Sequence, residues 1–303
     1  MRLVADIGGT NARVALCAGG VIDAATVQRF SNADYNSLTD LLHAYCDAHA
    51  QTVIDEMVIA VAGPVHASRA TLTNRNWTII AAELEQAFTC KRVVLLNDLT
   101  ALGYAVPTLT ADQVTRICGQ DVPDDPNGQA LVVGIGTGFN ISQVITKEKC
   151  TACPPAEAGH ISMPSAIVSK LEDHAIHANA FPTVETLFSG RGLTAFCRNL
   201  TGESSLTGEA AISLYSDPAQ QQLTRAIDTY AALLGLLLRD FSLSYMPSHG
   251  TYLAGSVGRA IAACAAEPLV KVFHGPCQFR LQDKPPIFVA KADGAALVGC
   301  AQF

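Results

Sequence analysis

The chain has 303 residues, of which 49% are hydrophobic and 16% are charged, so it can bury a sizeable core and has a length typical of two lobes. Its formal net charge is -7 and it contains no run rich in lysine and arginine, which argues against a nucleic acid partner held by phosphate neutralisation. A small neutral substrate is easier to accommodate.

Neither a membrane span nor a signal peptide is expected. The most apolar stretch, residues 230–238, is followed at once by Arg239 and Asp240 and is far shorter than the roughly 20 residues that cross a bilayer. Residues 1–6 hold no extended apolar segment before the first acidic residue. We therefore expect a buried helix at residues 230–238, no membrane partner and a cytoplasmic protein.

The ten cysteines are scattered, often within apolar runs, which is typical of reduced, buried thiols. Cys150 and Cys153 have metal-like spacing and His160 follows them, but no second tight pair of ligands occurs. A coincidental pair is therefore favoured over a zinc or redox site.

The first part of the chain alternates strand and helix signals. Strand-like runs at residues 3–6 and 12–17 flank a glycine turn, and a third strand is expected near residues 20–22. Residues 37–49 carry apolar residues at helical spacing, and residues 56–63 form an apolar run that ends in glycine. This order of three strands, a helix and a strand indicates an α/β layer.

A second helix is expected at residues 79–88, and a buried strand follows at residues 92–98. The polar residues of that strand, Asn97 and Asp98, come only at its C-terminal end, where open α/β sheets bind ligands. The polar, proline-containing segment 113–128 is expected to be a loop that follows the first lobe.

The second part of the chain restarts the same pattern. An apolar strand and a glycine turn at residues 129–138 precede a β-prone run at residues 140–145. Helical patterns dominate residues 166–244, and a strand at residues 250–255 leads into a helix that begins near Val257.

A strand-like run at residues 286–290 precedes Asp293 and Gly294, which should cap and start a final helix that packs back on the first lobe. We therefore place a small lobe at residues 1–107 plus about 292–303, and a large lobe at residues 108–291.

The turn at residues 6–11, Asp-Ile-Gly-Gly-Thr-Asn, suits a phosphate. Its glycines let the backbone approach a phosphate closely, Thr10 adds a hydroxyl donor, and Asp6 is placed to hold Mg²⁺ through water. An ordinary hairpin is the alternative. A second glycine- and threonine-containing turn follows at residues 134–138, Gly-Ile-Gly-Thr-Gly. Two such turns favour the interpretation that both bind one polyphosphate.

Two other kinds of nucleotide site do not fit. No glycine-lysine-serine/threonine sequence occurs, which excludes a Walker A loop. The glycine spacing at residues 134–138 departs from the dinucleotide fingerprint, and the run that follows is predicted to be a strand rather than a helix.

Asn97 and Asp98 follow five residues of apolar strand. An aspartate there can act as general base towards a hydroxyl that attacks a γ-phosphate, and the neighbouring amide can hold an adjacent hydroxyl. An N-cap for a helix starting at Thr100 is the alternative, and both roles can coexist.

Glu157 and His160 lie three apart in a loop that contains proline and glycine, and Glu185 lies just before the run Ser-Gly-Arg-Gly at residues 189–192. Carboxylates and imidazoles suit a polyol, because they exchange hydrogen bonds with vicinal hydroxyls, whereas anionic substrates would call for arginines. Taken singly, Glu185 also fits a solvated helix residue, and His160 a structural histidine.

With these motifs in order, the sequence resembles bacterial glucokinase of the non-ROK type, a branch of the actin-like, hexokinase-type ATPase superfamily. The resemblance covers nearly the whole chain and rests on these segments: 6–13, 72–77, 97–101, 136–138, 157–160, Glu185 with 189–192, and 253–255. It implies a two-lobed actin-like ATPase (ribonuclease H-like) α/β fold, in which each lobe is a mixed sheet with helices and a cleft between the lobes closes on the sugar.

The resemblance also implies that ATP and Mg²⁺ phosphorylate the 6-hydroxyl of glucose. The implied sugar contacts are Asn97, Asp98, Glu157, His160 and Glu185, with Asp98 as the base. The implied nucleotide contacts are Gly8, Gly9, Thr10, Asn11, Gly136, Thr137 and Gly138 for the phosphates, and Gly255 near the adenosine. Dimers are common in such kinases, so the resemblance allows a homodimer.

The chain departs from the family at four places: Ala158 replaces the first glycine of Glu-Gly-Gly-His, Phe139-Asn140 replaces leucine-glycine, Arg191 replaces proline, and Ser256 replaces glycine. Asn140 is expected to add a side chain close to the sugar and the γ-phosphate, which would alter the accepted sugar or slow turnover.

Three functions remain to be compared: a glucokinase or close hexokinase, a kinase for another polyol or amino sugar, and a non-enzymatic sugar sensor. A DNA-binding sensor would need a helix-turn-helix ahead of the first strand, which begins within three residues of the N-terminus. The first function is favoured.

Overall fold

The computed structural model describes residues 1–49, 52–72, 75–119, 127–148, 150–276, 285–291 and 294–303. Three parts of the sequence predictions lie outside these residues: Thr73 and Asn74 of the segment 72–77, residues 120–126 of the expected loop, and Asp293 of the expected helix cap.

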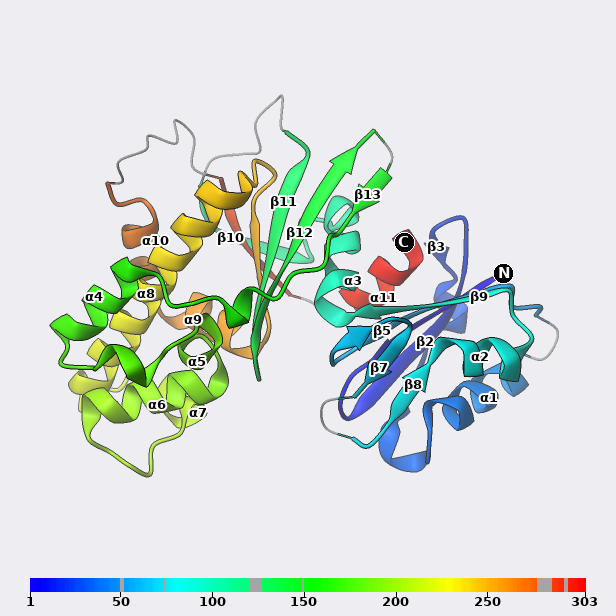
Figure 1. Ribbon diagram of the computed structural model, residues 1–303, viewed down its shortest axis with the longest axis horizontal. Helices are drawn as coiled ribbons and strands as arrows, with labels where there is room; N and C mark the ends of the chain where they lie inside the picture. Colours follow the sequence, from blue (N-terminus) through cyan, green and yellow to red (C-terminus); the bar gives the residue numbers. More distant parts are fainter. Residues whose placement is uncertain (50–51, 73–74, 120–126, 149, 277–284, 292–293) are drawn as a thin grey trace. The chain divides into compact units, whose positions relative to one another are not determined.

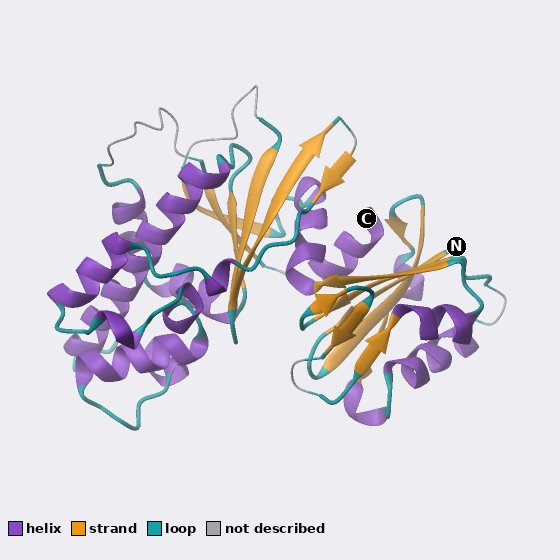
Figure 2. Cartoon of the chain, viewed as in Figure 1, coloured by secondary structure: helices purple, strands orange, loops and turns teal. Residues whose placement is uncertain are grey.

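The chain forms two compact units (Figure 1). Unit 1 contains Met1–Leu109, Thr151–Cys153 and Ala292–Phe303, and unit 2 contains Thr110–Cys150 and Pro154–Lys291. Each unit combines a mixed sheet with helices (Figure 2), which confirms the predicted fold class of two α/β lobes.

The sheet of unit 1 has the strand order β3-β2-β1-β5-β9, and β4 also pairs with β2. Its strands are β1 (Arg2–Ile7), β2 (Asn11–Ala18), β3 (Val21–Ile22), β4 (Gln28–Ser31), β5 (Glu56–Val61) and β9 (Arg92–Asn97). Strands β1, β5 and β9 are parallel, and their register places Ile7 beside Val61 and Val61 beside Asn97. The turns that follow these strands therefore meet at one edge of the sheet.

The helices of unit 1 are α1 (Leu38–Ala48), α2 (Ala81–Phe88), α3 (Asp98–Ala105) and α11 (Ala295–Gln302). Because side chains alternate along a strand, Leu3 and Ile7 of β1 point into the core beneath α1 and α2, and Val4 points into the core beneath α3 and α11. Helices thus cover both faces of this sheet (Figure 2).

A three-stranded sheet of β6 (Val65–His66), β7 (Arg69–Thr71) and β8 (Thr78–Ile80) adds to unit 1. The helix predicted at residues 79–88 begins later, at Ala81, because Ile79 and Ile80 extend β8. Short 3-10 helices are η1 (Ala24–Thr26), η2 (Asn32–Asp34) and η3 (Val106–Thr108) in unit 1, and η4 (Ala158–His160) and η5 (Ala178–Ala180) in unit 2.

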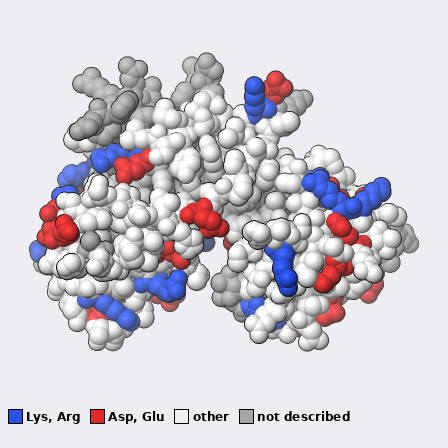
Figure 3. Space-filling model, viewed as in Figure 1, with Lys and Arg blue, Asp and Glu red and all other residues white. Residues whose placement is uncertain are grey.

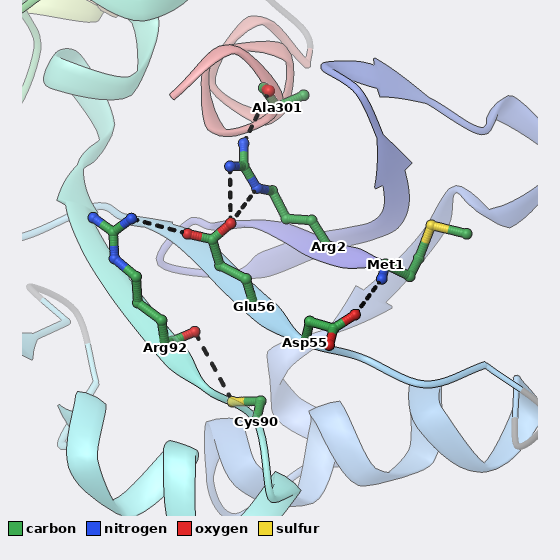
Figure 4. Close-up of polar contacts among 7 residues, drawn as sticks. All are labelled: Met1, Arg2, Asp55, Glu56, Cys90, Arg92 and Ala301. Atoms are coloured by element: carbon green, nitrogen blue, oxygen red, sulfur yellow. Dashed lines mark hydrogen bonds and ion pairs between the residues drawn. The ribbon is translucent and has the colours of Figure 1, made fainter.

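A polar network fastens the C-terminal helix to the sheet of unit 1 (Figure 4). Arg2 Nε donates to Glu56 Oε2 at 2.9 Å, and Arg2 Nη1 donates to the carbonyl oxygen of Ala301 at 3.2 Å. Arg92 Nη1 donates to Glu56 Oε1 at 3.2 Å. One glutamate thus links three adjacent parallel strands, and Arg2 extends the link to α11.

The sheet of unit 2 contains the order β10-β15-β14-β11-β12. The strands are β10 (Val114–Cys118), β11 (Gln129–Ile135), β12 (Phe139–Lys147), β14 (Thr251–Ala254) and β15 (Ile287–Ala290), and β13 (Cys150–Ala152) follows β12 in the chain. β11 and β14 are parallel, with Gly134 beside Ala254, so the turns after both strands meet at one edge.

Helices pack around this sheet: α4 (Ser165–Asp173), α5 (Val184–Leu187), α6 (Gly190–Thr201), α7 (Gly208–Ser213), α8 (Gln221–Tyr245), α9 (Ser256–Cys264) and α10 (Ala266–Phe273). The apolar stretch 230–238 lies within α8, where Tyr230 and Leu234 are fully buried, as predicted. No helix within the described residues combines the length and apolar character that crossing a bilayer requires.

Strand β10 corrects the prediction that residues 113–128 form a loop. It pairs antiparallel with β15, and its register shifts between Arg116 and Cys118. Thr115 and Arg116 are exposed, so this edge strand lacks the apolar alternation by which a strand is recognised in a sequence.

Charged side chains of both signs are interspersed among uncharged ones on the face in view in Figure 3. This distribution is typical of a solvated protein surface and differs from the basic stripe of a nucleic-acid-binding face.

Candidate active site

The turn after β1 leaves two N–H groups available for an anion. It is closed by Gly8 N, which donates to the carbonyl oxygen of Asn11 at 2.9 Å. Within the described residues, the N–H groups of Gly9 and Thr10 have no acceptor. Two consecutive free N–H groups in a glycine turn form the kind of concavity that binds phosphate.

Asn32 supports this turn and was not singled out in the sequence. Its Nδ2 donates to the carbonyl oxygen of Gly8 at 2.8 Å, and its backbone N donates to that of Thr10 at 2.9 Å. It is fully buried, and its Oδ1 has no hydrogen-bond partner among the described residues. Only the tertiary fold brings η2 under the turn, so no local sequence signal could have revealed this contact.

Asp6 lies two residues before the turn, is half-buried, and is directly opposite Arg13 in the pairing of β1 with β2. Cross-strand partners have Cβ atoms about 4.5–5.5 Å apart, so the carboxylate has a cationic neighbour. The described residues contain no group of three or more His, Cys, Asp or Glu side chains that could hold a metal ion. One carboxylate beside a turn with free N–H groups fits Mg²⁺, which takes few protein ligands and binds largely through phosphates and water.

Asn97 ends β9 and caps α3. Its Oδ1 accepts from Leu99 N at 3.0 Å, and its Nδ2 donates to the carbonyl oxygen of Gly63 at 3.0 Å. The predicted N-cap role therefore belongs to Asn97 rather than to Asp98, and the helix begins at Asp98 rather than at Thr100. The correction leaves Asp98 in the first turn of α3.

Asp98 has an oriented but desolvated carboxylate. Its Oδ1 accepts from Leu99 N at 2.9 Å, and the side chain keeps part of its surface accessible. Burial raises the pKa of the Asp98 carboxyl above its ordinary value, and the Leu99 N–H and the Asn97 amide oppose this shift only in part. A raised pKa in a partly accessible carboxylate is characteristic of proton-transfer groups.

The turn after β11 in unit 2 has a similar construction. Gly136 N donates to the carbonyl oxygen of Gly138 at 2.9 Å, and Gly190 N, at the start of α6, donates to that of Gly136 at 2.8 Å. In the part of the chain that the structure describes, the N–H groups of Thr137 and Gly138 have no acceptor. This turn can therefore also hold an anion.

Glu185, on α5, braces this second turn. Its Oε2 accepts from Phe139 N at 3.0 Å, and its Oε1 lies 3.5 Å from Arg191 Nη2. A Cβ atom on Gly138 would lie 2.6 Å from Glu185 Oε2, so the glycine allows this approach. Glu185 is thus half-buried and bonded to this turn, rather than a solvated helix residue.

Glu157 and His160 lie at the two ends of a short turn and are both exposed, whereas Ala158 and Gly159 between them are buried. His160 N donates to the carbonyl oxygen of Glu157 at 3.2 Å. A Cβ atom on Gly159 would overlap the carbonyl oxygen of Phe139. The two buried residues hold the turn against β12, which leaves the carboxylate and the imidazole facing outwards.

A cavity of about 900 Å³ lies beside the second turn, within unit 2. It is lined by residues of that turn and of α6, α7 and α9: Gly136, Thr137, Arg191, Leu193, Ile212 and Val257 among them. Its volume is within the range of sites that hold small ligands and cofactors.

Gly255 lies next to Gly136, because a Cβ atom on Gly136 would be 4.0 Å from the Gly255 Cα. Gly255 has φ +80°, and a Cβ atom there would overlap the carbonyl oxygen of Ile135. Only glycine can turn the chain from β14 into α9 at this place.

The structure brings the predicted residues together in two groups, one in each unit. The unit 1 group comprises Asp6, Gly8, Gly9, Thr10, Asn11, Asn97 and Asp98, which follow or end β1 and β9 at one sheet edge. The unit 2 group comprises Gly136, Thr137, Gly138, Glu157, His160, Glu185 and Gly255, which surround the turn after β11.

A family model and individual relatives both indicate the same family. The family model described as Glucokinase matches residues 3–303. Glucokinase from Saccharophagus degradans is 30% identical over 269 residues, covering 84% of this chain and 82% of that protein. Glucokinase from Brucella suis biovar 1 is 28% identical over 313 residues, covering 99% of this chain and 90% of that protein.

Two solved structures are also similar. A glucokinase from an Antarctic psychrotroph superposes with a TM-score of 0.82 at 27% identity, covering 99% of this chain and 97% of that chain. A ROK family glucokinase from Streptomyces griseus, in complex with glucose and AMPPNP, has a TM-score of 0.61 at 19% identity over 99% of this chain and 97% of that chain, which is a likeness of fold.

Proposed function

The chain belongs to the glucokinase family and phosphorylates glucose with ATP, and we propose that it acts on the 6-hydroxyl with Asp98 as general base. The carboxylate of Asp98 carries the proposal: it lies just after the carboxyl end of a parallel strand, accepts from Leu99 N at 2.9 Å, and has a pKa raised by burial. A base with a pKa shifted towards the working pH transfers protons more efficiently than an ordinary aspartate.

In the proposed reaction, the 6-oxygen of glucose attacks the γ-phosphorus of ATP, and its proton passes to the Asp98 carboxylate. The bond between the γ-phosphorus and the bridging oxygen breaks, and ADP leaves. The Leu99 N–H keeps the carboxylate in one orientation during this transfer. In this step the protein would orient the Asp98 carboxylate and accept the hydroxyl proton on it.

We propose that Asn97, Glu157, His160 and Glu185 complete the sugar contacts. Glu157 and His160 are exposed, so their polar atoms are accessible to sugar hydroxyls. Asn97 donates one amide hydrogen to Gly63, and its second amide hydrogen is available for a hydroxyl oxygen. Glu185 Oε2 already accepts from Phe139 N, and Glu185 Oε1 pairs with Arg191. Both oxygens would accept a sugar hydroxyl through their remaining lone pairs.

We propose that the free N–H groups of Gly9, Thr10, Thr137 and Gly138 bind the phosphates, within turns that also include Gly8, Asn11 and Gly136. The cavity beside Gly255 would hold the adenosine. Asp6 would hold Mg²⁺ through water, and a bound Mg²⁺ supplies charge neutralisation between the phosphates.

A coupled assay of ATP consumption against a panel of hexoses and amino sugars tests the proposal. Glucose should give the highest kcat/KM, and Asp98→Ala should lower turnover at least about a hundredfold with the fold intact. Near-normal turnover in Asp98→Ala would refute the base, and a higher kcat/KM with another sugar would assign the chain to a different hexose or amino sugar. Tight sugar binding without turnover of any sugar would indicate a sensor.

A further inference from the structure

Asn140 connects strand β12 to the turn that carries Glu157. Its Nδ2 donates to the carbonyl oxygen of Ala156 at 2.7 Å, and its Oδ1 accepts from Ala158 N at 3.0 Å. The same Nδ2 lies 3.5 Å from Glu157 Oε2. One side-chain amide therefore binds the backbone on both sides of Glu157 and also approaches its carboxylate.

The amide itself is held in one orientation. Asn140 Oδ1 also accepts from Ile141 N at 2.8 Å, so the side chain is fixed to its own strand. A side-chain amide has both a donor and an acceptor. It can therefore bind a backbone carbonyl and a backbone N–H of the neighbouring segment at the same time. The side chain faces residues 156–158, so its effect on a sugar would pass through Glu157.

The rest of the turn is packed against the same strand. Gly159 lies against the Phe139 carbonyl with no room for a Cβ atom, and the buried Ala158 donates its N–H to Asn140. Residues 139 and 140 thus hold the turn at successive points, while Glu157 itself is exposed. An exposed carboxylate on a fixed backbone is preorganised for a ligand.

We propose that Asn140 is a positioning residue for sugar recognition: it holds Glu157 where a sugar hydroxyl meets it, and thereby sets glucose affinity and the discrimination between glucose and its epimers. The inference rests on the proposed function, because it assigns Glu157 to the sugar. Substitution of Asn140 should therefore change the affinity for the sugar and leave the affinity for ATP unchanged.

The first test compares Asn140→Ala with Gln143→Ala, a matched change on the same strand. The Gln143 side chain donates to Gln129 Oε1 on the neighbouring strand β11 at 3.2 Å. Asn140→Ala should raise KM for glucose about tenfold, as expected for the loss of one or two hydrogen bonds, and reduce the preference for glucose over its epimers. KM for ATP should stay within about twofold, and Gln143→Ala should match the unaltered protein in every constant.

Asn140→Asp adds a second test, the pH dependence of KM for glucose, which would not change if Asn140 only stabilised the fold. It has the same shape, but its carboxylate cannot donate to Ala156 and would repel Glu157. Two further ionisable groups lie on adjoining segments: Glu185, whose Oε2 accepts from Phe139 N next to Asn140, and His160, which ends the turn that Asn140 holds. Protonation of one carboxyl at lower pH restores a donor, so KM for glucose in Asn140→Asp should fall, relative to the unaltered protein, as pH falls from about 7 towards the ordinary carboxyl range near 4.

Glucose binding by isothermal titration calorimetry separates this inference from the proposed function. An unaltered protein that neither binds nor phosphorylates glucose would overturn both. An active protein whose glucose KM and epimer preference survive Asn140→Ala would overturn the positioning role alone, as would an equal loss for ATP and glucose. If Asn140→Ala fails to fold by circular dichroism, the isosteric Asn140→Asp decides, and a pH profile parallel to that of the unaltered protein would overturn the role.

Discussion

Asp98 combines an ionisable group with surroundings that disfavour its charge, so activity and stability should respond to it in opposite ways. Burial raises the pKa of its carboxyl in the folded protein above the ordinary value of about 3.9. As pH rises from that value through the raised pKa, the folded state loses stability, because it must ionise a desolvated carboxyl. The same ionisation would create the proposed base.

Asp98→Asn should therefore lower kcat at least about a hundredfold, while its melting temperature at pH 7 equals or exceeds that of the unaltered protein. In the unaltered protein, kcat/KM should fall as pH drops through the raised pKa of Asp98, and this acid limb should be absent from the residual activity of the variant. A variant that melts earlier at neutral pH, or that keeps the acid limb, would contradict this account.

Asn32 should affect the nucleotide more than the sugar. Asn32→Ala removes the donor to the Gly8 carbonyl, so the turn with the free N–H groups of Gly9 and Thr10 loses its support. We expect KM for ATP to rise about three- to tenfold, the loss typical of one partly buried hydrogen bond, with KM for glucose unchanged. Ser31→Ala is the control, since among the residues that the structure describes Ser31 Oγ accepts from Ala33 N alone, at 3.3 Å. An equal rise in KM for ATP and for glucose would show that Asn32 does not act through the proposed phosphate contact.

The sequence indicated candidate site residues where the pattern that marks them is local. Asn97 and Asp98 were recognised because polar residues end an apolar strand, and the glycines at residues 8–9 because they adjoin a threonine in a turn. Asn32 and the partners of Asn140 could not be predicted, because their contacts join segments 24 and 16–18 residues apart. Nothing in the spacing of these residues indicates that such segments meet.

At the level of elements, α3 and α11 pack closely together in unit 1. A Cβ atom on Gly299 would overlap the carbonyl oxygen of Ala101, so the two helices touch through backbone atoms. Gly299→Ala should lower the free energy of unfolding by about 1–3 kcal/mol or more, because backbone cannot move aside as a flexible side chain can. Urea denaturation measures this loss.

Gly258→Ala is the matched control within a helix. Its Cβ atom would lie 3.6 Å from the Ile135 Cβ, which is ordinary van der Waals contact. It should change the free energy of unfolding by less than about 1 kcal/mol, and the helix preference of alanine favours a gain. Equal stability losses in the two variants would show that close helix packing is not what selects glycine at residue 299.

Elements were predictable where one face is consistently apolar. Helix α1 follows its pattern, with Leu38, Leu41, Leu42 and Tyr45 buried and Ser37 Oγ accepting from Asp40 N at its start. Strand β10 was missed because it lies at a sheet edge with polar exposed residues. The helix at residues 79–88 was placed two residues early, since Ile79 and Ile80 suit a strand and a helix equally well.

On the scale of the whole molecule, each unit joins segments that are far apart in the chain. In unit 2, β14 lies between β11 and β15, so the turns that hold Gly136 and Gly255 meet although more than a hundred residues separate them. In unit 1, α11 returns from the far end of the sequence to cover the first strand. The glycine turn after β1 therefore rests on a sheet that α11 covers.

The C-terminal helix should be indispensable to unit 1. Leu297, Cys300 and Ala301 are almost fully buried against Val4 and its neighbours on one sheet face, and Ala301 accepts from Arg2. Burying a leucine side chain stabilises by about 1.5–3 kcal/mol, so losing the helix would remove much of a typical stability of about 5–15 kcal/mol.

Deletion of residues 294–303 should therefore unfold unit 1 and abolish activity, while the amides of α8 in unit 2 stay protected in hydrogen exchange. Gln302→Ala is the control, because Gln302 Nε2 donates to the Gly20 carbonyl oxygen at 2.8 Å on the exposed rim and adds little buried area. It should change the free energy of unfolding by no more than about 0.5 kcal/mol. Retained amide protection in β1 and β5 of the truncated chain would mean that the sheet of unit 1 folds without its C-terminal cover, and equal loss of protection in α8 would mean that the two units do not unfold separately.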